Sequence, residues 1–221
     1  FVFNIDGVKV LQQPSLDGNA LATQLAQTDL GLREMGRSAG ENGAIERFDL
    51  ALKWVGVVAE RIGKAPGRKL LIWTGPGWPL LDQPNINMSS KGQQQMFQTL
   101  VRLSATLRES HMALYSVSIG DPTPTTYLYQ GFLKGVKTAE KINPPNLSLK
   151  VLATESGGRV MSPNNDVAGQ ISACVQDASS FYTLSFDPPR ADRANEYHDL
   201  KVEIDKPGLT ARTSTGYYNQ P

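Results

Sequence analysis

Apolar side chains recur every three or four residues in several segments of the chain, and this spacing predicts amphipathic helices. The longest predicted helix covers residues 43–63. One helix begins after Asp17, whose carboxylate suits a helix N-cap, and another begins after Ser89 or Ser90 for the same reason. Further helices are expected over residues 127–136 and 147–156, and a last one follows Asn164 or Asn165, with Val167, Ile171, Cys174 and Val175 facing inward.

Two continuous apolar runs predict strands that are buried on both faces. Residues 70–73 and 112–119 are each bounded by turn residues, a pattern typical of a parallel sheet with helices on each side. Gly157 and Gly158 are expected to end a helix in the left-handed conformation, and residues 159–161 to form a brief strand. The order of helices and strands therefore predicts an α/β fold with a mostly parallel sheet.

Both ends of the chain show patterns that predict antiparallel hairpins. Near the start, residues 1–5 and 8–12 are apolar runs separated by Asp6 and Gly7, a strong hairpin-turn signal. Near the end, residues 181–186 predict a strand. A hairpin is expected beyond it, because Leu200, Val202 and Ile204, and then Leu209, Ala211 and Thr213, alternate with polar residues on either side of Lys206, Pro207 and Gly208.

Length and composition limit the functional classes. The 221 residues, of which 40% are hydrophobic, suffice for one large domain with a full core and a small appendage. The net charge of +1 gives no long-range field that attracts nucleic acid or an anionic membrane. No apolar stretch approaches the roughly 20 residues that span a bilayer. The single cysteine excludes an internal disulfide framework and a cysteine-rich zinc site.

The loops that follow the two apolar strands form the first candidate site. In open α/β sheets, ligands collect at the carboxyl edge of the strands. A tryptophan in such a loop is a natural contact residue if it is exposed. The candidate partner-binding residues at this edge are Thr74, Gly75, Gly77, Trp78, Asp121 and Thr123.

The nucleotide-binding motifs are incomplete in this sequence. Gly75 and Gly77 match the start of a dinucleotide fingerprint, but Leu80 stands where the third glycine is needed. Pro79 also removes a backbone donor that a pyrophosphate would use. A tight turn is therefore the favoured interpretation of these glycines. No segment matches the glycine, lysine and hydroxyl pattern of a phosphate-binding loop.

The side chains that carry most enzyme chemistry do not form a catalytic pattern. His111 and His198 lack the spacing of metal ligands, and both are interpreted as structural or solvated. Cys174 lies on an apolar helical face, which favours a packed core thiol over a nucleophile. Asp121 with the hydroxyls of Thr123, Thr125 and Thr126 suits a Mg²⁺ or Ca²⁺ ligand set, and the favoured alternative is that Asp121 begins a turn.

Five segments carry a family resemblance, and in chain order they are PGRKLLIWTGPGWP, MALYSVSIGDP, LATESGGRVM, FYTLSFDPP and KVEIDKPGLTARTSTGYY. Together they resemble the von Willebrand factor A family, in its bacterial, Acidobacteria-type VWFA-related branch. The resemblance implies a Rossmann-like three-layer α/β/α fold over residues 1–187, with a mostly parallel sheet of about six strands and an antiparallel edge strand. Residues 188–221 then form a C-terminal β-hairpin extension packed on this domain, and the first strand is expected upstream of Phe1.

The family's adhesion site holds Mg²⁺ through an Asp-x-Ser-x-Ser loop, a threonine from a second loop and an aspartate after a later strand. Asp6 and Gly7 do not begin that first motif, and residues 29–73 contain no threonine. Gly75 follows Thr74 where the family places the aspartate. The resemblance therefore implies a degenerate metal site without assigned ligands, and Mg²⁺ is expected only if an upstream segment supplies the missing groups.

The resemblance and the missing catalytic groups together imply a non-enzymatic protein-interaction or adhesion-type module outside the cytoplasm, periplasmic or secreted. Its partner is expected to be a protein and not a nucleic acid. Two alternatives stay open. One is an α/β enzyme that binds a nucleotide or small ligand through residues 75–78 and the loop of Asp121. The other is a scaffold or assembly component that uses the C-terminal hairpin to extend a partner's sheet.

Overall fold

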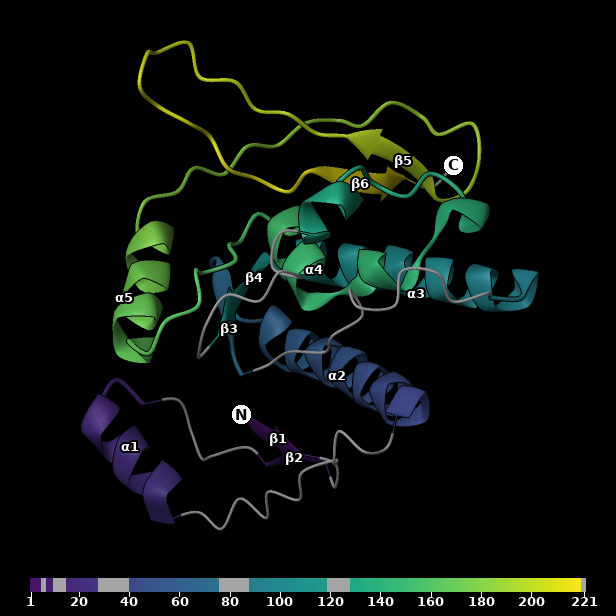
Figure 1. The fold of residues 1–221 in the computed structure, drawn as a ribbon. Coiled ribbons are helices and arrows are strands. Elements are labelled where there is room, and N and C mark those ends of the chain that lie inside the picture. Colours follow the sequence, from purple (N-terminus) through teal and green to yellow (C-terminus); the bar gives the residue numbers. More distant parts are fainter. Residues whose placement is uncertain (5–6, 10–14, 28–39, 76–87, 119–127, 220–221) are drawn as a thin grey trace. The chain divides into compact units, whose positions relative to one another are not determined.

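The computed structural model describes residues 1–4, 7–9, 15–27, 40–75, 88–118 and 128–219 (Figure 1). The chain divides into two compact units, residues 1–57 and 58–221. The described residues form a mixed α/β structure with five α-helices, one parallel pair of strands and two antiparallel pairs. The predicted α/β class is confirmed at this level.

The first unit begins with the predicted hairpin. Strand β1 (Val2–Asn4) pairs antiparallel with β2 (Gly7–Lys9), and β2 begins at Gly7 rather than after it. Helix α1 (Gly18–Gln27) follows, and the Asp17 carboxylate accepts hydrogen bonds from the backbone N–H groups of Asn19 and Ala20 at 2.9 and 3.1 Å. The predicted N-cap is therefore confirmed.

Helix α2 (Gly40–Gly63) runs across the boundary between the two units. It begins three residues before the predicted helix and ends where the sequence placed its end. Apolar residues recur at helical spacing along α2. Of these, Phe48, Leu52, Val55 and Val58 are buried, and Ile62 near the end is half-buried.

A parallel pair of strands organises the second unit. Strand β3 (Lys69–Thr74) pairs in parallel with β4 (Met112–Val117), residue for residue from Lys69 opposite Met112. Every residue of β4 is buried, as predicted, whereas β3 is half-buried and ends on the exposed Thr74. The expectation that β3 is buried on both faces is therefore wrong, because β4 is its one strand neighbour among the described residues.

Helices cover both faces of this pair. Helix α5 (Val167–Ala178) packs through Cys174 against Ala113, Tyr115 and Val117 of β4. Residues of opposite parity on a strand face the other way, where α3 (Ser90–Glu109) and α4 (Leu149–Glu155) contact β4 (Figure 1). A helix, sheet, helix sequence of layers therefore exists within this unit.

The glycine pair after α4 brings the chain back to β4. Gly157 has a φ of +80°, the left-handed conformation predicted for the end of this helix. A Cβ on Gly158 would lie 1.9 Å from the Leu114 carbonyl oxygen, so glycine is needed for this close approach. The predicted strand at 159–161 is reduced to one parallel bridge between Val160 and Ser116.

The N-caps of α3 and α5 differ in how well they agree with the prediction from the sequence. Ser89 caps α3 and accepts a hydrogen bond from the Gly92 N–H at 3.2 Å, as predicted. Helix α5 is capped by Asp166, not by Asn164 or Asn165, and Asp166 accepts from Gly169 N–H at 2.8 Å. Val175 of α5 is exposed, against the prediction that it faces inward.

The segment between β4 and α5 also contains three short 3₁₀ helices among the described residues. They are η3 (Leu128–Phe132), η4 (Ala139–Lys141) and η5 (Pro144–Leu147).

The C-terminal hairpin forms with different strands from those predicted. Strand β5 (Glu196–Asp199) pairs antiparallel with β6 (Gly216–Asn219), and the chain reverses at residues 206–209. The predicted strands at 200–204 and 209–213 are not formed, and neither is the one at 181–186. Pairing is confined to the base, where Tyr197 and Tyr218 pack with ring centroids 5.2 Å apart.

Candidate functional site

Two of the candidate site residues, Thr74 and Gly75, are described, and they lie at the carboxyl edge of β3 and β4. Thr74 pairs with Val117, and the N–H of Gly75 donates to the Val117 carbonyl oxygen at 3.1 Å. The two candidate loops therefore leave the sheet at the same edge. Thr74 is exposed there, and Gly75 has a φ of +142°. The other candidate residues, Gly77, Trp78, Asp121 and Thr123, lie outside the described residues.

A buried amide joins this edge to the start of α5. The Nε2 of Gln170 donates to the carbonyl oxygen and Oδ1 of Asn164, at 3.2 and 3.0 Å, and to the Ser118 carbonyl oxygen at 3.4 Å. Gln170 is 4% exposed, and its Oε1 has no hydrogen-bond partner among the described residues. Gln170 was not among the residues predicted from the sequence, although its position three residues after Val167 places it on the inward face of the helix.

The histidines and the cysteine occupy structural positions. His111 lies in the turn between α3 and β4 with a φ of 51°, and His198 stacks on Tyr217 with ring centroids 5.3 Å apart. Cys174 is fully buried, and burial raises the pKa of its thiol. In the described part of the chain, no group of three or more His, Cys, Asp or Glu side chains is placed to hold a metal ion.

An ion cluster ties α5 to β4 and to the C-terminal hairpin. Asp177 accepts hydrogen bonds from the Tyr115 hydroxyl at 2.7 Å, from Arg159 at 3.4 Å and from Arg212. Burial acts to raise the pKa of Asp177, but the hydrogen bonds from Arg212 and Tyr115 outweigh it and lower the pKa below its usual value. The carboxylate is therefore engaged in hydrogen bonds that hold α5, β4 and the hairpin together.

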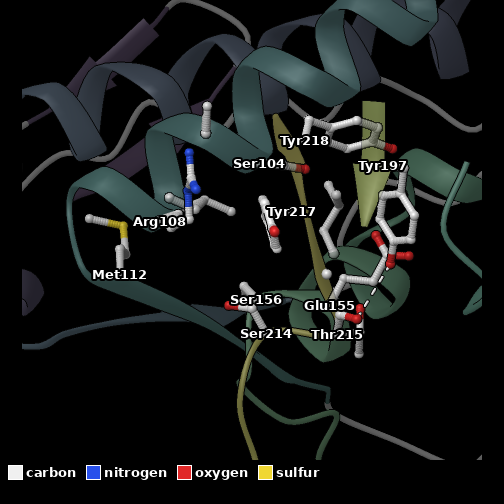
Figure 2. Close-up of a pocket in the computed structure, with 14 residues that line it drawn as sticks. Ser104, Arg108, Met112, Glu155, Ser156, Tyr197, Ser214, Thr215, Tyr217 and Tyr218 are labelled. Atoms are coloured by element: carbon white, nitrogen blue, oxygen red, sulfur yellow. Dashed lines mark hydrogen bonds between the residues drawn. The ribbon is translucent and has the colours of Figure 1, made fainter. Parts of the chain in front are cut away.

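A small cavity lies where α3, α4 and the β5–β6 pair meet (Figure 2). Its volume is about 40 Å³, which accommodates a water-sized molecule and excludes a nucleotide or sugar. Arg108 and Glu155 line it together with the aromatic rings of Tyr197, Tyr217 and Tyr218. Burial raises the pKa of Glu155 to about 8, and burial together with the neighbouring Glu155 charge raises that of Tyr197 to about 12.

Most of the large apolar side chains that are exposed among the described residues lie in the C-terminal part of the sequence. Tyr182 is 94% exposed and Leu184 is 69% exposed, although both belong to an apolar run. Burying such side chains stabilises a complex by roughly 25 cal/mol per Å² of apolar surface removed from water. We call the following set of exposed side chains the C-terminal apolar residues: Phe181, Tyr182, Leu184, Phe186, Ile204 and Leu209.

Comparison of the chain with protein-family models, with curated proteins and with solved structures gave no match. Among the described helices, none combines the length and apolar character needed to cross a membrane.

Proposed function

We propose that this chain is a non-enzymatic protein-interaction module of the von Willebrand factor A type, acting outside the cytoplasm. The observation that carries the proposal is the exposure of the C-terminal apolar residues, Tyr182 and Leu184 above all. A soluble protein gains nothing from presenting an uncharged, aromatic-rich segment to water, whereas a protein partner that covers it gains the burial of that surface.

The fold supports the proposal at a coarser level. Helix α5 on one face of the parallel pair and α3 and α4 on the other are compatible with the three-layer domain that the resemblance implies. The finer description is part of the proposal: a mostly parallel central sheet with an antiparallel edge strand over residues 1–187, and a hairpin extension beyond it. The module needs no metal ion for the contact, because the surface is apolar.

The two alternatives are favoured unequally. An enzyme that uses residues 75–78 and Asp121 has no supporting observation, because residues 76–78 and Asp121 lie outside the described residues. Nucleotides that leave the melting temperature unchanged would argue against it further. The assembly alternative is favoured by one specific observation, the open hairpin beyond β5 and β6.

The proposal is tested by removing the exposed apolar groups. We expect a Tyr182→Ser, Leu184→Ser double variant to lose a captured protein that the unmodified chain retains on a column, because two contact side chains are removed. The amount captured should fall about tenfold or more. The matched control is Val175→Ser on α5, which removes an exposed apolar group elsewhere. Quantitative mass spectrometry of the bound proteins provides the readout, and identical profiles for all three chains would contradict the proposal.

A further inference from the structure

The two arms of the C-terminal hairpin separate beyond β5 and β6. A backbone hydrogen bond of 2.9 Å joins Leu200 to Thr215 at the base. Between this hydrogen bond and the turn, the described structure shows no backbone hydrogen bond from residues 201–205 of the first arm to residues 209–214 of the second. The arms and Thr154 of α4 line an open cavity of about 600 Å³. We call this cavity the hairpin slot; its arms form the long loop beyond β5 and β6 in Figure 1.

The chemistry of the hairpin slot matches an extended, uncharged polypeptide. Backbone N–H and C=O groups that lack a neighbouring strand are the groups to which an added strand binds. The charged side chains that line the hairpin slot already have partners, since Lys201 pairs with Glu203 and Arg212 pairs with Asp177. The remaining lining is uncharged. Its apolar members are Leu200, Val202, Ile204, Leu209 and Ala211, and its hydroxyl-bearing members are Thr154, Thr210, Thr213, Ser214 and Thr215.

Residues 181–186 of the same sequence have the complementary properties. The segment contains aromatic, aliphatic and hydroxyl side chains and no Asp, Glu, Lys or Arg. The structure gives its backbone no hydrogen bond to any described residue. The Phe181 ring lies 6.0 Å from the Arg68 guanidinium, and the Phe186 ring lies 5.5 Å from Tyr217. These contacts hold both ends of the segment, which does not line the hairpin slot of its own chain.

We propose that two copies of this chain associate by exchanging these elements, so that residues 181–186 of each copy enter the hairpin slot of the other as an added strand. The arrangement is self-complementary, because each copy supplies one strand and one slot, and a two-fold axis then closes the dimer. The inference rests on the proposed function, because it identifies the protein partner as a second copy of the chain.

The first test is the mass of the full chain in solution. Light scattering across protein concentrations from about 1 μM to about 1 mM should show a transition from the 24.1 kDa chain to twice that mass. Tyr182→Lys with Leu184→Lys charges the strand, and Ile204→Lys with Leu209→Lys charges the slot; all four side chains are exposed, so folding is expected to persist. Each pair should raise the dimer dissociation constant by about 100-fold or more, while Val175→Lys should leave it unchanged.

The second test mixes the two variants. The strand of the slot variant still fits the slot of the strand variant, so an equal mixture should recover a heterodimer that neither variant forms alone. General adhesion between apolar patches would give no recovery, because both variants carry added positive charge. A monomeric unmodified chain, or a mixture without recovery, would overturn the inference. A monomer that still captures another protein through Tyr182 and Leu184 would leave the proposed function in place, which separates the two failures.

Discussion

At the scale of single residues, Glu155 links the small cavity to the stability of the fold. Its carboxyl pKa rises from the ordinary 4.5 to about 8 because the group is buried beside Tyr197 and Tyr218. Between these two values the folded chain holds a proton that the unfolded chain has released. The contribution of protonated Glu155 to the stability of the folded chain is therefore complete below pH 4.5, and it is lost as the pH rises through about 8.

We expect the free energy of unfolding to fall as the pH rises across that window, by up to about 1.4 kcal/mol per pH unit from this group. In Glu155→Gln the side chain keeps its size but no longer titrates, so this component of the pH dependence should disappear. Urea denaturation of both chains at several pH values between about 5 and 8 measures the difference. Parallel pH profiles for the two chains would show that Glu155 is not the responsible group.

At the scale of elements, Asp177 connects three parts of the second unit. It lies on α5, receives the hydroxyl of Tyr115 from β4 and pairs with Arg212 from the second arm of the hairpin. Tyr115 is fully buried, so its hydroxyl depends on this acceptor, whereas Arg212 is partly exposed. The Tyr115 hydrogen bond should therefore account for more stability than the ion pair.

Replacement of Asp177 by Ala should destabilise the chain by about 1–3 kcal/mol, because the Tyr115 hydroxyl then stays buried without an acceptor. Asp177→Asn should cost less, because the amide oxygen still accepts that hydrogen bond. In a double-mutant cycle, adding Tyr115→Phe to Asp177→Ala should recover part of the loss. Strictly additive effects in urea denaturation would contradict the coupling.

At the scale of the whole molecule, the proposed module makes its contacts without a metal ion. The described residues present no cluster of ligands for a metal, and Gly75 follows Thr74 where the resemblance implies an aspartate. We therefore expect Mg²⁺, Mn²⁺ and Ca²⁺ to leave the melting temperature of the 221-residue chain unchanged. The measurement is a thermal melt with each ion. If an ion binds with a dissociation constant in the micromolar range, an ion concentration 100 times that constant would add about 2.7 kcal/mol to the stability of the folded chain. A clear upward shift with any ion would restore the adhesion-site mechanism.

The sequence predicted the elements whose cause is local. The caps at Asp17 and Ser89, the helical spacing of the buried apolar residues in α2 and the left-handed Gly157 follow from neighbouring residues, and the structure confirms each of them. The buried strand β4 was also evident, because a run that is apolar on both faces has few other solutions. At the candidate edge, the sequence correctly placed Thr74 and Gly75 at the carboxyl end of β3.

Tertiary structure decided every feature that depends on contacts between residues distant in the sequence. The alternating segments 181–186, 200–204 and 209–213 predict strands, yet a strand also needs a neighbour for its backbone, and the ladder forms only at β5 and β6. Period-two alternation determines which face is apolar but not what covers it. The cavity at Glu155 and the cluster at Asp177 likewise join residues from separate elements, so no local pattern revealed them. The sequence alone thus determined the longer α-helices, the caps at Asp17 and Ser89 and the buried strand β4, and the tertiary structure decided the cap of α5 and which apolar segments stay exposed.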